Sequence, residues 1–165
     1  TEVSVRDNND KELSIGQIGE LYVRGPQIMA GYWQQEYETR KTLTNDGWLR
    51  TGDIVRMDQN GYVYLIDRKK NMIIVSGFKV YPAEIEKVIS AMPGVLEVAV
   101  ISVKDATQTE TVKAIVVKKD HGLKEQEIIS YCRERLAAYK IPKIVEFTES
   151  LPKSNVGKIM RQNLK

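Results

Sequence analysis

The sequence has very few of the residues that build redox and metal sites. Its 165 residues include one cysteine, Cys132, and one histidine, His121. A single cysteine excludes an internal disulfide, and the lack of a Cys/His cluster argues against a zinc site or a Cys–His dyad. Cys132 lies on the apolar face of a predicted helix, so we expect it in the core. His121, within Asp-His-Gly, is expected in a turn.

Long apolar runs and strong charge are also absent. No stretch is apolar for long enough to span a bilayer, and there are no internal repeats. A formal net charge of +3 fits an anionic substrate or a weak contact with a membrane surface, and it does not require nucleic acid. With 42% hydrophobic and 28% charged residues, the composition is that of a globular protein with a real core.

The first residues carry no initiator methionine and open directly on the alternation typical of a strand. We therefore expect the chain to be a piece of something longer.

Short strands dominate the pattern up to about residue 67. Asn60-Gly61, between two strand-like runs, is a strong signal for a hairpin turn. The predicted strands cover residues 2–6, 19–24, 54–57 and 62–66, and one short helix is predicted over residues 37–43.

Helices and strands alternate after Lys70, where we place the domain boundary. Pro82 stands at the favoured first position of a helix, and apolar residues then recur at helical spacing. The predicted elements are strands 72–75, 95–103, 111–119 and 144–148, helices from 82 and over 124–140, and a short basic helix at the end. The order β-α-β-β-α-β predicts an α+β fold in which two helices cover one face of a small sheet.

Three charged residues are candidates for chemistry. Asp53, in Thr-Gly-Asp, could accept both vicinal hydroxyls of a ribose, and the preceding glycine lets a ligand approach the backbone. Arg68, at a strand end, could meet a phosphate or the same ribose. Lys158, in Val-Gly-Lys, could neutralise charge developing on a carboxylate or phosphate oxygen, although Pro152 stands where a P-loop needs glycine. Each residue taken alone is more commonly a turn residue or a solvated charge.

Two other classes of function compete with a ligand site. The order β-α-β-β-α-β also belongs to RNA-recognition modules, but residues 111–117 contain no aromatic residue on which a base could stack. A regulatory or interaction domain without chemistry remains open, although such a domain would have no use for intact Asp53, Arg68 and Lys158.

Three motifs occurring together resemble one family. They are NDGWLRTGDIVRMDQNGYVYLIDRKK at 45–70, VSGFKVYPAEIE at 75–86 and LPKSNVGK at 151–158. The chain resembles the C-terminal part of bacterial long-chain fatty acid–CoA ligases, which are acyl-CoA synthetases of the adenylate-forming superfamily. The resemblance implies that a fatty acid and Mg-ATP give an acyl-adenylate and pyrophosphate. The thiol of CoA then attacks the acyl carbon and AMP leaves.

The resemblance also implies roles for single residues. Asp53 would hold the ribose hydroxyls of ATP with the help of Arg68, and Lys158 would be the lysine of the adenylation step only. Lys70 falls at the family's hinge, where some members carry aspartate, so it matches by place rather than by residue type.

The glycine turn of the second motif would serve the second half-reaction. Ser76, Gly77, Phe78 and Lys79 would line the approach of the pantetheine arm of CoA once the small domain has rotated. By the same resemblance, residues 1–69 would be the end of a large adenylation domain, in its β-barrel part, and residues 70–165 a mobile lid domain.

The family's phosphate loop, adenine-pocket motif and acyl tunnel have no counterpart in this sequence. We therefore expect the chain alone to be inactive, with the ligands of Mg²⁺ outside it, no metal ligands within it, and the rest of its own N-terminal domain as its partner.

A cytoplasmic location with peripheral contact at the inner membrane is compatible with the resemblance. An aryl-CoA or luciferase-like enzyme stays open as an alternative, because the acyl pocket would lie elsewhere.

Overall fold

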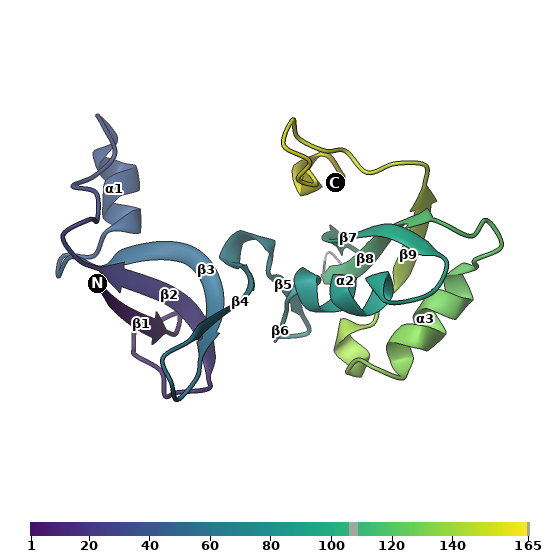
Figure 1. The fold of residues 1–165 in the computed structure, drawn as a ribbon, viewed down its shortest axis with the longest axis horizontal. Coiled ribbons are helices and arrows are strands. Elements are labelled where there is room, and N and C mark those ends of the chain that lie inside the picture. The colour runs from purple at the N-terminus through teal and green to yellow at the C-terminus, as the bar shows by residue number, and fades with distance from the viewer. Residues whose placement is uncertain (106–108, 165) are drawn as a thin grey trace. The chain divides into compact units, whose positions relative to one another are not determined.

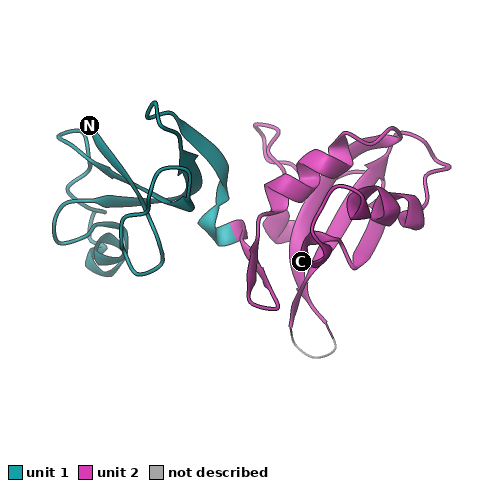
Figure 2. Ribbon diagram, turned by 90° about the horizontal axis from the view of Figure 1, so that it is seen from below, with its two compact units in different colours: residues 1–70 teal, residues 71–165 magenta. Residues whose placement is uncertain are grey.

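The chain forms two compact units, Thr1–Lys70 and Asn71–Lys165, which Figure 2 colours separately. This computed structural model describes residues 1–105 and 109–164. The loop between the predicted strands 95–103 and 111–119 includes residues 106–108, which lie outside the described residues.

The first unit is a four-stranded antiparallel sheet with one short helix (Figure 1). The strands follow one another in the order β1-β2-β3-β4, so each pairs with its neighbour in sequence. The elements are β1 (Glu2–Arg6), β2 (Ile18–Arg24), α1 (Glu36–Thr42), β3 (Leu49–Met57) and β4 (Val63–Arg68).

The predicted hairpin at Asn60-Gly61 is confirmed. Gly61 has φ +82°, which a residue with a side chain rarely adopts, and Asp58 accepts hydrogen bonds from the backbone N–H groups of Asn60 and Tyr62 at 2.9 and 3.0 Å. This turn fixes the register in which β3 pairs with β4 and therefore which side chains face each other across the two strands.

Strand β3 begins five residues earlier than predicted, at Leu49 rather than at 54. The prediction treated Thr-Gly-Asp as a turn, but the strand continues on both sides of it, pairing with β2 through Tyr22↔Arg50 and Glu20↔Ile54. The pairing shifts register between Glu20 and Tyr22, and the irregularity accommodates Gly52 at φ +72°. Thr-Gly-Asp is therefore a bulged segment inside a strand.

The second unit is a three-stranded sheet covered by helices. Antiparallel β7 and β8 form a long hairpin, and β9 joins β8 in parallel, which requires a crossover that α3 supplies. The elements are β5 (Ile73–Val75), β6 (Phe78–Val80), α2 (Pro82–Ser90), β7 (Val95–Lys104), β8 (Glu110–Lys118), α3 (Glu125–Arg133) and β9 (Ile144–Thr148).

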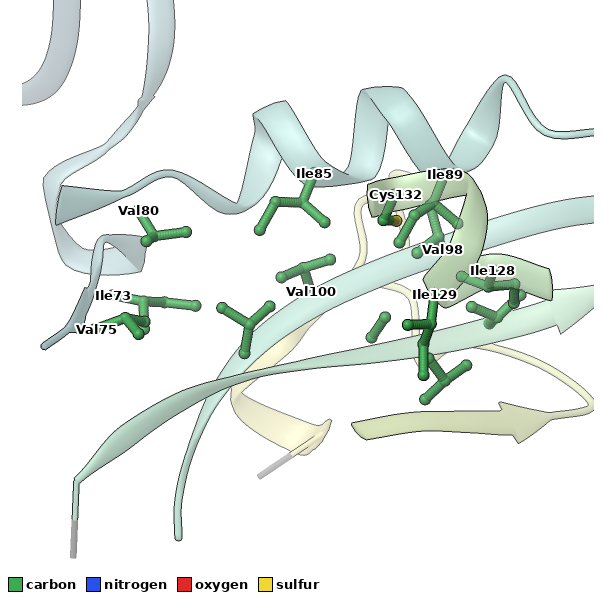
Figure 3. Packing of buried hydrophobic residues seen from close by; sticks show 14 of the residues in the cluster. Ile73, Val75, Val80, Ile85, Ile89, Val98, Val100, Ile128, Ile129 and Cys132 are labelled. Carbon is green, nitrogen blue, oxygen red and sulfur yellow. The ribbon is translucent and has the colours of Figure 1, made fainter. Parts of the chain in front are cut away.

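Both faces of this sheet are covered. On one face, α2 and α3 insert Ile85, Ile89, Ile128 and other apolar side chains against the strands, as Figure 3 shows. On the other face a smaller cluster around Ile101 and Ile115 is covered by Leu151, Ile159 and Leu164 of the C-terminal segment. The alternation of β7 and β8 thus supplies two cores, and the expected α+β class is confirmed.

Two expectations for the second unit are wrong in detail. The helix predicted over 124–140 ends at Arg133, because Leu136 and Tyr139 reach the core from a turn and a separate 3-10 segment at Ala138–Lys140. The predicted strand at 72–75 does not join the sheet but pairs with β6, an unpredicted strand that follows the tight turn at Ser76-Gly77.

Candidate functional site

In the first unit the structure brings Asp53 and Arg68 together. They face each other as register partners on β3 and β4, and the Arg68 guanidinium donates to Oδ1 of Asp53. The Asp53 side chain is 26% exposed and that of Arg68 is 52% exposed, so both can reach a ligand. Two residues predicted separately from the sequence therefore form one ion pair at a strand end.

Hydrogen bonds of the Thr51 hydroxyl fix the backbone around Asp53. The Thr51 hydroxyl donates to the carbonyl of Leu21 at 2.9 Å and accepts from the N–H of Asp53 at 3.1 Å. Among the described residues none donates a hydrogen bond to Oδ2 of Asp53. The site thus offers a fixed carboxylate with one oxygen still able to accept a hydrogen bond from a ligand.

Sequence reasoning missed a buried carboxylate behind this segment. Glu20 is 5% exposed and accepts from the N–H of Gly52 at 3.2 Å and from the Lys69 ammonium at 2.7 Å. It connects the bulge that precedes Asp53 to the residue that follows Arg68. The signal in the sequence is a glutamate inside the predicted strand 19–24, between Gly19 and Leu21.

A pocket of about 330 Å³ opens beside the pair. Its lining consists of Gly52, Arg68, Lys69 and Lys70, and Lys70 lies in the 3-10 turn Lys69–Asn71. Basic side chains suit a phosphate, and a carboxylate suits sugar hydroxyls. The arrangement is chemically suited to a nucleotide.

In the second unit, the four residues predicted for the pantetheine approach lie together on the β5–β6 hairpin. Ser76 and Gly77 have φ +49° and +85°, the left-handed pair of angles of a type I′ turn. The Phe78 ring stacks on Tyr139 with centroids 4.6 Å apart but stays 55% exposed, and Lys79 is also exposed. The hairpin tip is a rigid, partly apolar edge.

Lys158 lies in a small hairpin of its own. Lys153 and Ile159 pair as an antiparallel bridge, and the N–H of Ser154 donates to the carbonyl of Lys158 at 2.8 Å. Gly157 makes the turn with φ +78°. The Lys158 side chain is exposed, and among the described residues none forms a hydrogen bond or ion pair with its ammonium. A fixed backbone thus carries a free cation.

The remaining candidates behave as structural residues. Cys132 is fully buried in the core, as predicted, and burial raises the pKa of its thiol. His121 is exposed in the predicted turn. Over residues 1–105 and 109–164, no group of three or more His, Cys, Asp or Glu side chains could hold a metal ion, and no helix is long and apolar enough to cross a membrane.

Part of the second unit is similar to a known protein family. Residues 84–158 match the family described as AMP-binding enzyme C-terminal domain. The matched residues include most of α2, the three-stranded sheet, α3 and the hairpin up to Lys158.

Likeness to single proteins extends beyond residues 84–158 to the whole chain. It is 53% identical over all 165 residues to a long-chain-fatty-acid–CoA ligase of Escherichia coli O157:H7, which confirms the predicted resemblance. The chain spans 29% of the length of that relative.

Two solved structures are also similar. ATP-bound MatB from Rhodopseudomonas palustris is 39% identical with a TM-score of 0.93, over 99% of this chain and 33% of that one. The anthranilate CoA ligase AuaEII, in complex with anthranoyl-AMP, is 33% identical with a TM-score of 0.86, over 99% of this chain and 32% of that one.

Proposed function

We propose that this chain supplies one wall of the nucleotide site and the mobile lid of an ATP-dependent long-chain fatty acid–CoA ligase. One observation carries the proposal: Asp53 and Arg68 are ion-paired on neighbouring strands, beside a pocket lined with basic residues. The likeness to a fatty acid–CoA ligase at 53% identity supports it.

In the first half-reaction a carboxylate oxygen of the fatty acid would attack the α-phosphorus of ATP and pyrophosphate would leave. Asp53 would accept the ribose hydroxyls, with Arg68 beside it, and Lys158 would offset the charge that develops on the carboxylate and phosphate oxygens. Mg²⁺ would accompany ATP, with its ligands outside this chain. An ATP-bound relative of 39% identity supports the use of ATP.

In the second half-reaction the thiol of CoA would attack the acyl carbon of the acyl-adenylate and release AMP. Ser76, Gly77, Phe78 and Lys79 would line the approach of the pantetheine arm, since the hairpin presents them at one exposed edge. Residues 1–69 would belong to a large adenylation domain and 70–165 would be the lid, with Lys70 as the pivot between the two half-reactions.

Two classes of acid are candidates for the substrate. The acyl pocket would be formed by the rest of the N-terminal domain, which we propose as the chain's partner along with fatty acid, ATP and CoA. The likeness to an anthranilate CoA ligase at 33% identity favours an aryl acid as the second candidate. A non-catalytic regulatory domain is a weaker alternative to a ligase, because such a domain would not need Asp53, Arg68 and Lys158.

The test is Lys158→Ala in the complete protein that carries this chain. We expect acyl-adenylate formation, measured as fatty-acid-dependent exchange of pyrophosphate into ATP, to fall by about 10²- to 10³-fold or more, because no other side chain of this chain is proposed to neutralise the developing charge. Thioester formation from supplied acyl-adenylate should stay at the parent rate. Equal loss in both half-reactions would contradict the assignment.

Folding is the control for this variant. The Lys158 ammonium has no partner among the described residues, so we expect the melting temperature of Lys158→Ala to equal that of the parent. Running the exchange assay with a long-chain fatty acid and with an aryl acid separates the two candidate substrate classes.

A further inference from the structure

The Lys158 hairpin is attached to the body of its domain by two ion pairs, one on each side of the lysine. Before Lys158 in sequence, the Lys153 ammonium pairs with Glu97 of β7. After it, the Arg161 guanidinium pairs with Glu86 of α2. Both carboxylates line the pocket of about 540 Å³ that lies between α2, β7 and the hairpin.

The contact between Glu86 and Arg161 is the tighter anchor. Nη2 of Arg161 donates to both carboxylate oxygens of Glu86, at 2.8 and 2.7 Å, and Nε donates to Oε1 at 3.3 Å. Oε1 of Glu86 also accepts from the N–H of Val100 at 2.8 Å, which fixes the carboxylate against the sheet. The side chains are 17% and 30% exposed, so solvent screens the pair only in part.

The contact between Glu97 and Lys153 is different in kind. It is a single, more exposed contact, but Lys153 is itself a member of the bridge that closes the hairpin with Ile159. Holding Lys153 therefore holds the rung next to Lys158. Leu151 and Ile159 add apolar packing on the sheet, which limits how far the hairpin moves but not how its tip is rotated.

From this geometry we propose that Glu86 and Glu97 are positioning residues for Lys158. Their ion pairs set the orientation of the hairpin, so that the lysine meets the reacting oxygens in the adenylation step. The inference rests on the proposed function of Lys158. It goes beyond it by assigning a role to two carboxylates that never touch the substrate.

The reason to expect an effect is geometric. Lys158 is a flexible side chain on a short turn, and its charge stabilises a transition state only if its backbone is already in place. A displacement of about 1 Å at a reacting group can cost on the order of 10²-fold in rate. We expect the loss of one anchor on one side of the turn to permit a displacement of this order.

The experiment measures both half-reactions of the complete protein carrying Glu86→Gln, Glu97→Gln or both. We expect kcat of adenylation to fall roughly 10- to 100-fold in each single variant, and further in the double variant, with KM for ATP changed by no more than about two-fold. Thioester formation from supplied acyl-adenylate should not change, because Lys158 is proposed to act in adenylation alone. A merely structural role would slow both half-reactions.

Two matched variants sharpen the result. Glu84→Gln removes a comparable ion pair from the same helix, since Glu84 binds Lys140 at 2.7 Å rather than the hairpin, and it should leave adenylation at the parent rate. Combining Glu97→Lys with Lys153→Glu reverses the second pair and should restore most of the adenylation that Glu97→Lys alone removes. This swap lies at the surface, so it keeps the test valid even where Glu86→Gln folds poorly.

The outcomes separate this inference from the function on which it rests. If Lys158→Ala abolishes adenylation while Glu86→Gln and Glu97→Gln leave it intact, the positioning role is overturned and the ligase function stands. Equal slowing of both half-reactions, with no rescue by the charge swap, would also overturn it. If Lys158→Ala itself spares adenylation, the proposed function fails first.

Discussion

At the scale of single residues, the pair Asp53–Arg68 raises a question of hydrogen-bond capacity. Arg68 already donates to Oδ1, and a ribose would bring two more donors. An ionised carboxylate has about four lone-pair positions, so Oδ2 can take one hydroxyl while Oδ1 accepts the other alongside Arg68. The arginine need not leave for the sugar to bind, and it keeps the carboxylate oriented.

Cys132 gives a prediction at the same scale. Burial raises the pKa of its thiol, so less of it is the reactive thiolate at any given pH than in an exposed cysteine. We expect a thiol reagent such as DTNB at about pH 8 to label the folded protein far more slowly than the protein in denaturant. Prompt, complete labelling of Cys132 without denaturant would show that α3 opens locally and that this part of the core is loose.

At the scale of elements, the β5–β6 turn depends on one residue without a side chain. Gly77 has φ +85°, and a Cβ placed there would meet no atom within 4 Å, so the cost of a substitution lies in the backbone rather than in a clash. Gly77→Ala should lower the free energy of unfolding by about 1 kcal/mol, measured by denaturant titration. The hairpin contributes Ile73, Val75 and Val80 to the main core, so the substitution should lower the stability of the whole second unit.

Gly77→Asn is the matched comparison. Asparagine tolerates the left-handed region better than alanine, so this variant should recover part of the stability that Gly77→Ala loses. Identical losses in the two variants would mean that the turn conformation is not what limits stability here.

The elements also show what the sequence can and cannot predict. Turn chemistry located the hairpin at Asn60-Gly61 and the start of α2 at Pro82, because those residues restrict the backbone locally. The end of α3 was missed, since the apolar spacing through Leu136 does not reveal that Tyr139 reaches the core from a separate turn.

The candidate site was also predictable only in part. The motifs indicated Asp53, Arg68 and Lys158 as candidates. The burial of Glu20 and the anchoring of Glu86 by Arg161 depend on partners 49 and 75 residues away in sequence, which no local pattern encodes.

At the scale of the whole molecule, the proposed pivot at Lys70 can be tested by comparing the two half-reactions. Proline would fix φ near the value a 3-10 turn already has, so Lys70→Pro should fold while its backbone loses freedom to rotate. We expect one half-reaction to slow about ten-fold more than the other, in stopped-flow measurements of each step. Equal rates for both steps would argue against a pivot at this position.

Lys70→Ala is the comparison for that variant. It removes the side chain that lines the pocket but leaves φ free. We therefore expect it to weaken nucleotide binding without slowing one half-reaction more than the other. A difference between proline and alanine therefore measures backbone freedom apart from charge.

The free ammonium of Lys158 has a consequence for how such a domain can change over evolutionary time. Because nothing among the described residues binds this group, replacing it should cost the fold almost nothing, and under the proposed function only selection for catalysis would retain it. A lineage released from that selection would lose the lysine early while keeping Glu86, Arg161 and the core that surround it. Descendants of this chain could thus become folded, inactive binding domains through a single codon.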